Sequence, residues 1–165
     1  MAKAIVIYNS RGGNTKKVAT MIAEGLEADL KKSSKIPDLK DYKLIVLGTW
    51  VLAGSPSPAG KKYLSKLNSE QMKGKNVAMF ISAAGPDEPP LGQGPEAGII
   101  KDIVFEKMQK ILENKGINVV EERLSLKGAF RFFRFGPGAQ NKGYPTDEEL
   151  QKAKLFGESL KKYLK

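Results

Sequence analysis

The sequence predicts an α/β fold in which a parallel β-sheet is covered by helices on both faces. Short apolar runs without polar alternation, such as Ala4–Tyr8, alternate with longer stretches whose apolar residues recur at helical spacing. Strands buried on both faces and amphipathic helices produce these two patterns. The length of 165 residues is that of one domain, so we expect residues 1–165 to form a single domain.

The first half of the chain begins with a strand and an amphipathic helix. The strand is Ala4–Tyr8, and the helix follows from Asn14. Pro37 interrupts the next connection, which leaves room for a short strand near Lys35 and Ile36. A central strand, a short helix and a third buried strand are then expected at Leu44–Leu47, Ala59–Leu67 and Asn76–Ile81.

The second half begins with a connection rich in proline and glycine, Ala83–Gly98, which we expect to be irregular. An amphipathic helix follows from Ile100. The strand expected at Ile117–Leu126 carries charged residues, which is typical of an exposed edge. Thr146 and Glu149 have the spacing of a capping box and predict the start of a last helix.

The absence of cysteine and histidine excludes several kinds of chemistry. The chain cannot form a disulfide, a thiolate nucleophile, a protein-ligated iron–sulfur cluster, a His-based triad or an ordinary zinc site. No apolar run reaches the roughly 18 to 20 residues of a membrane span, and the first residues lack the features of a signal peptide. We therefore expect a cytoplasmic protein whose redox chemistry, if any, comes from a bound cofactor.

The chain is strongly basic, with 28 Lys and Arg residues against 18 Asp and Glu residues and a formal net charge of +10. Such a charge favours association with anionic partners and carries no information about the fold. Most of the lysines fall at positions expected on helix surfaces. We therefore expect a generally basic surface and no dedicated nucleic-acid site.

Three loops of unusual composition follow predicted central strands. They are Asn9–Thr15, Thr49–Ser57 and Ser82–Gly98. In an open parallel sheet, ligands bind beyond the carboxyl ends of the strands, at the point where the strand order reverses. The sequence therefore predicts a binding site between these loops.

The first of these loops, "SRGGNT", leads directly into a helix. Ser10, Asn14 and Thr15 offer side-chain donors, while Gly12 and Gly13 allow backbone N–H groups to turn inward. Unpaired N–H groups and the helix dipole favour an anion at such a position. The loop lacks both the Gly-Lys-Ser/Thr ending of a Walker A loop and the G-x-G-x-x-G pattern of dinucleotide-binding turns. By itself, it fits a phosphate cradle or a plain strand-to-helix turn.

Taken in chain order, these loops and their flanking elements resemble the flavodoxin family over nearly the whole length. The resemblance rests on "AIVIY", on "SRGGNT" in the place of the family's T-x-T-G-N-T phosphate loop, and on "KKVATMIAEGL", "LIVLGTW", "NVAMFISAAG" and "GYPTDEELQKAKLFGESL". It implies a doubly wound, five-stranded flavodoxin-like sheet of order 2-1-3-4-5. Flavin mononucleotide (FMN) would bind noncovalently across the loop ends.

The resemblance also implies which residues contact FMN. The phosphate would be surrounded by Ser10, Gly12, Gly13, Asn14 and Thr15. Trp50 would stack on the isoalloxazine ring, since a flat indole excludes water and supplies stacking area; a partly buried structural aromatic is the alternative. Thr49, Val51 and Leu52 would lie around the ring, and Ser82, Ala83, Ala84 and Gly85 would bound the other loop. No residue is expected to act as a catalytic acid or base.

The chain departs from the family pattern at two places in this site. Gly12 replaces a hydroxyl residue of the typical phosphate loop, so one side-chain hydrogen bond is lost. Arg11, Lys16 or Lys17 could compensate electrostatically, although both lysines also fit solvated surface charges. The second loop lacks the aromatic residue that many members have. One flavin face would then be open, which suits an approaching substrate or partner and equally suits weak flavin binding.

The resemblance implies an electron carrier that shuttles electrons between redox partners. Because family carriers are typically acidic and this chain is basic, a protein partner should present an acidic docking face. The stretch Phe130–Phe135, "FRFFRF", is a candidate docking surface, although its rings could instead cover the sheet edge with snorkelling arginines. Two alternatives are an FMN-dependent oxidoreductase acting on a quinone- or protoporphyrinogen-type substrate and a flavin-free binding module.

Overall fold

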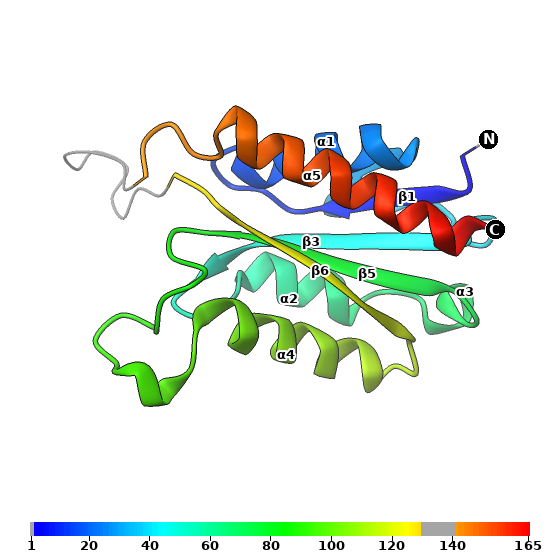
Figure 1. Cartoon of the computed structure of the whole chain (residues 1–165). Helices are drawn as coiled ribbons and strands as arrows, with labels where there is room; N and C mark the ends of the chain where they lie inside the picture. The colour runs from blue at the N-terminus through cyan, green and yellow to red at the C-terminus, as the bar shows by residue number, and fades with distance from the viewer. Residues whose placement is uncertain (1, 130–140) are drawn as a thin grey trace.

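The computed structural model describes residues 2–129 and 141–165 and confirms the α/β fold (Figure 1). A parallel sheet has the strand order β2-β1-β3-β5-β6. A short strand, β4, pairs antiparallel with the end of β3 and lies off this path, so the order of the remaining strands is the predicted 2-1-3-4-5. The strands are β1 (Ala4–Tyr8), β2 (Asp29–Lys32), β3 (Leu44–Leu52), β4 (Ser55–Pro56), β5 (Asn76–Ala83) and β6 (Val119–Lys127).

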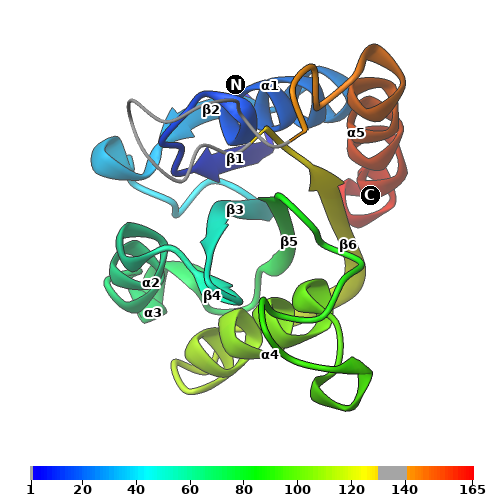
Figure 2. The same ribbon diagram turned by 90° about the vertical axis from the view of Figure 1, so that its left-hand side faces the viewer.

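Helices cover both faces of the sheet, as Figures 1 and 2 show. Helices α1 (Asn14–Leu26) and α5 (Asp147–Ser159) lie on one face, and α2 (Pro58–Ser65) and α4 (Ile100–Glu113) lie on the other. The shorter helical segments are α3 (Ser69–Met72), η1 (Ser33–Lys35), η2 (Pro95–Ala97) and η3 (Leu160–Leu164). The candidate docking surface Phe130–Phe135 lies outside the described residues.

Two apolar cores form because successive side chains on a strand point to opposite faces of the sheet. In β1, Ile5 and Ile7 belong to the core beneath α2 and α4, whereas Val6 belongs to the core beneath α1 and α5. All three side chains are fully buried. This explains why buried parallel strands appear in the sequence as uninterrupted apolar runs.

Two glycines allow α1 and α5 to pack closely. A Cβ atom on Gly25 would lie 2.0 Å from the carbonyl oxygen of Lys154, and one on Gly157 would lie 2.2 Å from that of Ile22. Any larger residue would therefore force the helices apart. At the start of α5, the Thr146 hydroxyl accepts a hydrogen bond from the Glu149 N–H at 3.2 Å, which confirms the predicted cap.

The structure corrects the position of the second strand. The sequence places it near Lys35 and Ile36, but β2 is Asp29–Lys32, and Lys35 belongs to the 3₁₀ turn η1. The chain pairs with β1 almost immediately after α1, with Asp29 opposite Ile5 and Lys32 opposite Tyr8. Because β1 ends at Tyr8, the pairing is complete before Lys35 is reached.

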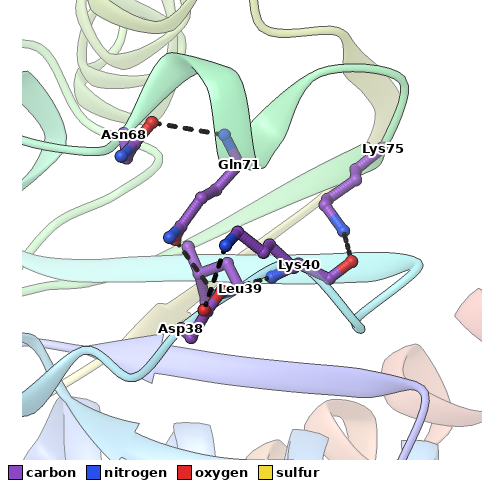
Figure 3. Close-up of polar contacts among 6 residues, drawn as sticks. All are labelled: Asp38, Leu39, Lys40, Asn68, Gln71 and Lys75. Carbon is purple, nitrogen blue, oxygen red and sulfur yellow. Dashed lines mark hydrogen bonds and ion pairs between the residues drawn. The ribbon is translucent and has the colours of Figure 1, made fainter.

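Polar contacts hold the amino ends of β3 and β5 together (Figure 3). The Lys75 ammonium donates to the carbonyl oxygen of Lys40 at 2.6 Å and also to that of Tyr42. The Gln71 side-chain oxygen accepts from the Leu39 N–H at 3.1 Å. These contacts fix the end of the sheet that lies opposite the predicted site.

Within residues 2–129 and 141–165, no helix combines the length and the apolar character that crossing a membrane requires.

Candidate functional site

A cavity of about 430 Å³ opens at the carboxyl ends of the strands, the end that faces the viewer in Figure 2. Its volume lies within the range of about 300 to 1,000 Å³ that is typical of small-molecule sites. The lining residues come from the three predicted loops and from the segment after β6: Ser10, Arg11, Gly12, Asn14, Thr15, Trp50, Val51, Ser82, Ala83, Ala84, Gly128 and Ala129. We call this space the central cavity.

The loop of residues 10–15, which we call the phosphate loop after its predicted role, reaches α1 through a turn that requires a glycine. Gly13 has φ 93°, in the left-handed region that glycine adopts without strain, and its N–H donates to the Ser10 hydroxyl at 3.1 Å. Helix α1 has no side-chain cap and no acidic residue in its first turn. The first N–H groups of the helix are therefore available to an anion beside the cavity.

Asn14 and Thr15 connect the phosphate loop to its neighbours. The Asn14 side-chain amide donates to the carbonyl oxygen of Ala129 at 2.6 Å. The Thr15 and Ser82 hydroxyls lie 2.8 Å apart, and both residues are buried. These contacts position the loop against β5 and against the segment after β6. The Asn14 amide keeps a second N–H for a ligand, and the Thr15 hydroxyl can donate to a ligand while it accepts from Ser82.

Trp50 lines the other part of the cavity as a partly buried side chain. The guanidinium carbon of Arg11 lies 5.8 Å from the centroid of the indole ring, within the roughly 6 Å reach of a cation–π contact. In the described part of the chain, Arg11 is also the only charged side chain that lines the central cavity. An anionic ligand would therefore meet one positive charge there and no carboxylate.

Four predicted site residues do not line the central cavity: Gly13, Thr49, Leu52 and Gly85. Gly13 shapes the turn into α1, and Leu52 pairs with Ser55 in the β3–β4 hairpin. Thr49 is fully buried, and its hydroxyl donates to the side-chain oxygen of Asn9. Thr49 does not line the cavity, although Trp50 does, because neighbouring side chains on a strand point to opposite faces.

A buried polar network connects two of the loops beside the central cavity, the one after β1 and the one after β3. The Asn9 side-chain oxygen accepts hydrogen bonds from the hydroxyls of Thr49 and Ser57, the latter at 3.1 Å. The Ser57 hydroxyl also accepts from the Gly60 N–H at 2.9 Å and thereby caps α2. The network joins the ends of β1 and β3 to the start of α2. A serine before Pro58 is a recognisable cap signal, but the link to Asn9 has no sequence signal.

Gly128 and Ala129 also line the central cavity, and the sequence does not predict them as site residues. Both follow β6, and the Gly128 N–H donates to the carbonyl oxygen of Ala83 at 2.9 Å. Their only sequence signal is their position after the last strand, whose carboxyl end lies at the same edge of the sheet as the other loops.

The chain is similar in sequence to known proteins along most of its length. Residues 5–126 match a family model described as a flavodoxin domain. An uncharacterized protein of Methanocaldococcus jannaschii, MJ0298, is 28% identical over 167 residues, covering 97% of this chain and 99% of the relative. The flavodoxin-like domain-containing protein BilS of Clostridioides difficile is 25% identical over 177 residues, covering 96% of each.

Solved structures share the fold at low sequence identity. A flavodoxin from the domain Archaea has a TM-score of 0.66 and 21% identity, covering 96% of each chain. A flavodoxin, WrbA-like protein from Agrobacterium tumefaciens has a TM-score of 0.69 and 17% identity, covering 98% of this chain and 96% of the other. A flavoprotein in complex with FMN from Lactobacillus acidophilus has a TM-score of 0.56 and 19% identity, covering 77% of this chain and 93% of the other.

Proposed function

The chain belongs to the flavodoxin domain family, and we propose on this basis that it binds FMN noncovalently and carries electrons between redox partners. The observation that carries the proposal is that one cavity combines an uncapped helix start at Asn14 with the flat indole of Trp50. The helix start suits a phosphate, and the indole suits a flat aromatic ring.

The phosphate end fits a monophosphate by the chemistry of its donors. The backbone N–H groups in the first turn of α1 would bind the phosphate together with side chains of Ser10, Asn14 and Thr15, while Arg11 would contribute charge. The position that a Cβ atom of Gly12 would occupy has no atom within 4 Å. The missing hydroxyl of the family pattern therefore leaves open space at this point of the loop.

The ring end is asymmetric. Trp50 and Val51 line one wall, and the small side chains of Ala83 and Ala84 line another. Trp50 would exclude water from one face of a bound ring, while the alanines would leave room at the second wall. FMN, when bound, would supply the redox chemistry, and the chain would orient it and set its surroundings.

The protein partner of such a carrier should present an acidic face. The formal net charge of +10 gives this chain a long-range attraction for negatively charged surfaces. Complementary charge accelerates encounter more than it increases affinity, so the effect should be greatest at low salt.

One observation favours a second candidate function. Because Ala83 and Ala84 line the wall on the second loop, a small flat molecule could approach the ring from that side. The second candidate is therefore an FMN-dependent oxidoreductase acting on a quinone- or protoporphyrinogen-type substrate.

The visible spectrum of the purified protein, titrated with FMN and followed during reduction, tests both candidates. We expect saturable flavin bands and a stable one-electron-reduced spectrum without turnover of quinones or reduced nicotinamides. Rapid turnover would support the oxidoreductase instead. The absence of saturable FMN binding would contradict both.

A further inference from the structure

A second cavity, of about 280 Å³, is lined by the phosphate loop together with β2 and η1. Ser10 and Arg11 line this space as well as the central cavity. Lys16 from the first turn of α1, Lys32 from the end of β2, and Ser33 from η1 also line it. We call it the lateral cavity. Neither the family resemblance nor the proposed FMN site accounts for it.

Three cations converge on the lateral cavity without a compensating acid. Arg11, Lys16 and Lys32 line it, and its described lining contains no carboxylate. Within residues 2–129 and 141–165, none of the three forms an ion pair, although lysines elsewhere pair with Glu24 and Glu27. Like charges gathered around one concave space repel each other, and a bound anion would relieve that repulsion.

Asn9 supplies an independent indication of a ligand. The residue lines the lateral cavity and is only 9% exposed. Its side-chain oxygen accepts from Thr49 and Ser57, but its amide nitrogen has no hydrogen-bond acceptor among the described residues. Because Asn9 lines the cavity, this N–H₂ group is a donor that an anion there could use.

We propose that the lateral cavity is a second anion site that binds a diphosphate group. Arg11 and Lys16 would hold one phosphate from the loop and α1 side. Lys32, with the hydroxyls of Ser33 and Ser34, would hold the other from the β2 and η1 side. Pockets that hold a whole small molecule usually have a volume of at least about 300 Å³. The lateral cavity is slightly smaller, at about 280 Å³, so any part of the ligand beyond the diphosphate would lie in solvent.

A matched pair of variants separates contact from diffuse charge. Lys32→Gln removes a cation that lines the lateral cavity but not the central one. Lys31→Gln makes the same charge change at the preceding residue, which is also exposed on β2 but lines neither cavity. Neighbouring side chains on a strand point to opposite faces, so only Lys32 should contact the anion.

The test is isothermal titration calorimetry of inorganic pyrophosphate into the FMN-saturated protein at fixed ionic strength. We expect one saturable site per chain, weakened about tenfold by Lys32→Gln and less than about twofold by Lys31→Gln, since a charged hydrogen bond is lost only in the first. The absence of saturable binding, or equal weakening by the two variants, would overturn the proposal. FMN in the central cavity prevents pyrophosphate from occupying the phosphate cradle during this measurement.

Two further measurements identify the molecule that carries the diphosphate and keep this test independent of the FMN proposal. ADP binding more tightly than pyrophosphate would identify a nucleotide diphosphate, and equal or weaker ADP binding would identify the free anion. FMN loading is measured first by absorbance, so a failure of FMN binding is visible before pyrophosphate is added. In that case the same titration is run on the flavin-free protein, where sensitivity to Lys32→Gln but not to Lys31→Gln again decides the question.

Discussion

Gly12 occupies the position at which the family's typical phosphate loop has a hydroxyl residue that donates a hydrogen bond to the phosphate. Its φ lies outside the left-handed region, and a Cβ atom there would have no neighbour within 4 Å. A serine should therefore fit without strain. We expect Gly12→Ser to lower the Kd for FMN by about tenfold, since a hydrogen bond to a charged group contributes about 1.5 to 3 kcal/mol.

A fluorescence titration with FMN measures this change. Gly12→Ala is the matched control, because it fills the same space without a hydroxyl and should not tighten binding. Equal affinities of the serine and alanine variants would show that the hydroxyl does not reach the phosphate.

Asn14 and Thr15 should matter more for FMN than the neighbouring lysine does. Both side chains line the central cavity and also hold the loop through Ala129 and Ser82. We expect Asn14→Ala combined with Thr15→Ala to weaken FMN binding by at least about tenfold, through lost donors and a displaced loop. Lys16→Ala, an exposed change outside this cavity, should cost less than about twofold. Equal losses would contradict a cradle built from neutral donors.

At the scale of secondary-structure elements, the close contact between α1 and α5 depends on the small residues Gly25 and Gly157. Since a Cβ atom on Gly157 would lie 2.2 Å from the Ile22 carbonyl oxygen, the helices must shift to accept even alanine. We expect Gly157→Ala to lower the free energy of unfolding by about 1 to 3 kcal/mol despite the better helix propensity of alanine.

Urea denaturation measures this loss. Lys152→Ala, an exposed change on the same helix, should have an effect within about 0.5 kcal/mol. A Gly157→Ala variant as stable as the parent chain would mean that the helices are not in such close contact.

The edge strand β6 is connected to the carboxyl-terminal turn η3 through Glu122. Lys162 and Tyr163 donate hydrogen bonds to this carboxylate, and they lower the pKa of Glu122 from 4.5 to about 2. A carboxyl whose folded-state pKa is lowered adds stability that is present above its unfolded pKa and lost as the pH falls through its folded pKa. The contribution should therefore be complete above about pH 4.5 and should disappear toward pH 2.

Glu122→Gln tests this connection. We expect a lower urea midpoint than that of the parent chain at pH 6, and a difference that shrinks as the pH falls from 4.5 toward 2. A difference that stayed constant over this range would mean that the charge of Glu122 does not stabilise the fold.

The elements differ in how far the sequence could predict them. Strand β1 and helix α1 were predicted correctly because an uninterrupted apolar run and a helical stripe are direct consequences of burial. Strand β2 was misplaced because "DLKK" lies at the sheet edge, where a strand buries little and resembles a loop. The resemblance gives the position of Thr49 in the chain but not the direction of its side chain, which is buried and does not line the central cavity.

At the scale of the whole molecule, the two ends of the sheet have separate roles. The contacts of Lys75 and Gln71 fix the amino ends of the strands, whereas both cavities lie beside the loops at the carboxyl ends. The lining residues Gly128 and Ala129 could be found only from this arrangement, because their role comes from where β6 ends.

Trp50 allows the central claim to be measured directly, because it is the single tryptophan of the chain. FMN should quench its fluorescence to saturation at one FMN per chain, since the indole is proposed to stack on the flavin ring. Riboflavin, which lacks the phosphate, should bind much more weakly. FMN binding without any change in Trp50 emission, or equal binding of riboflavin and FMN, would contradict the proposed site.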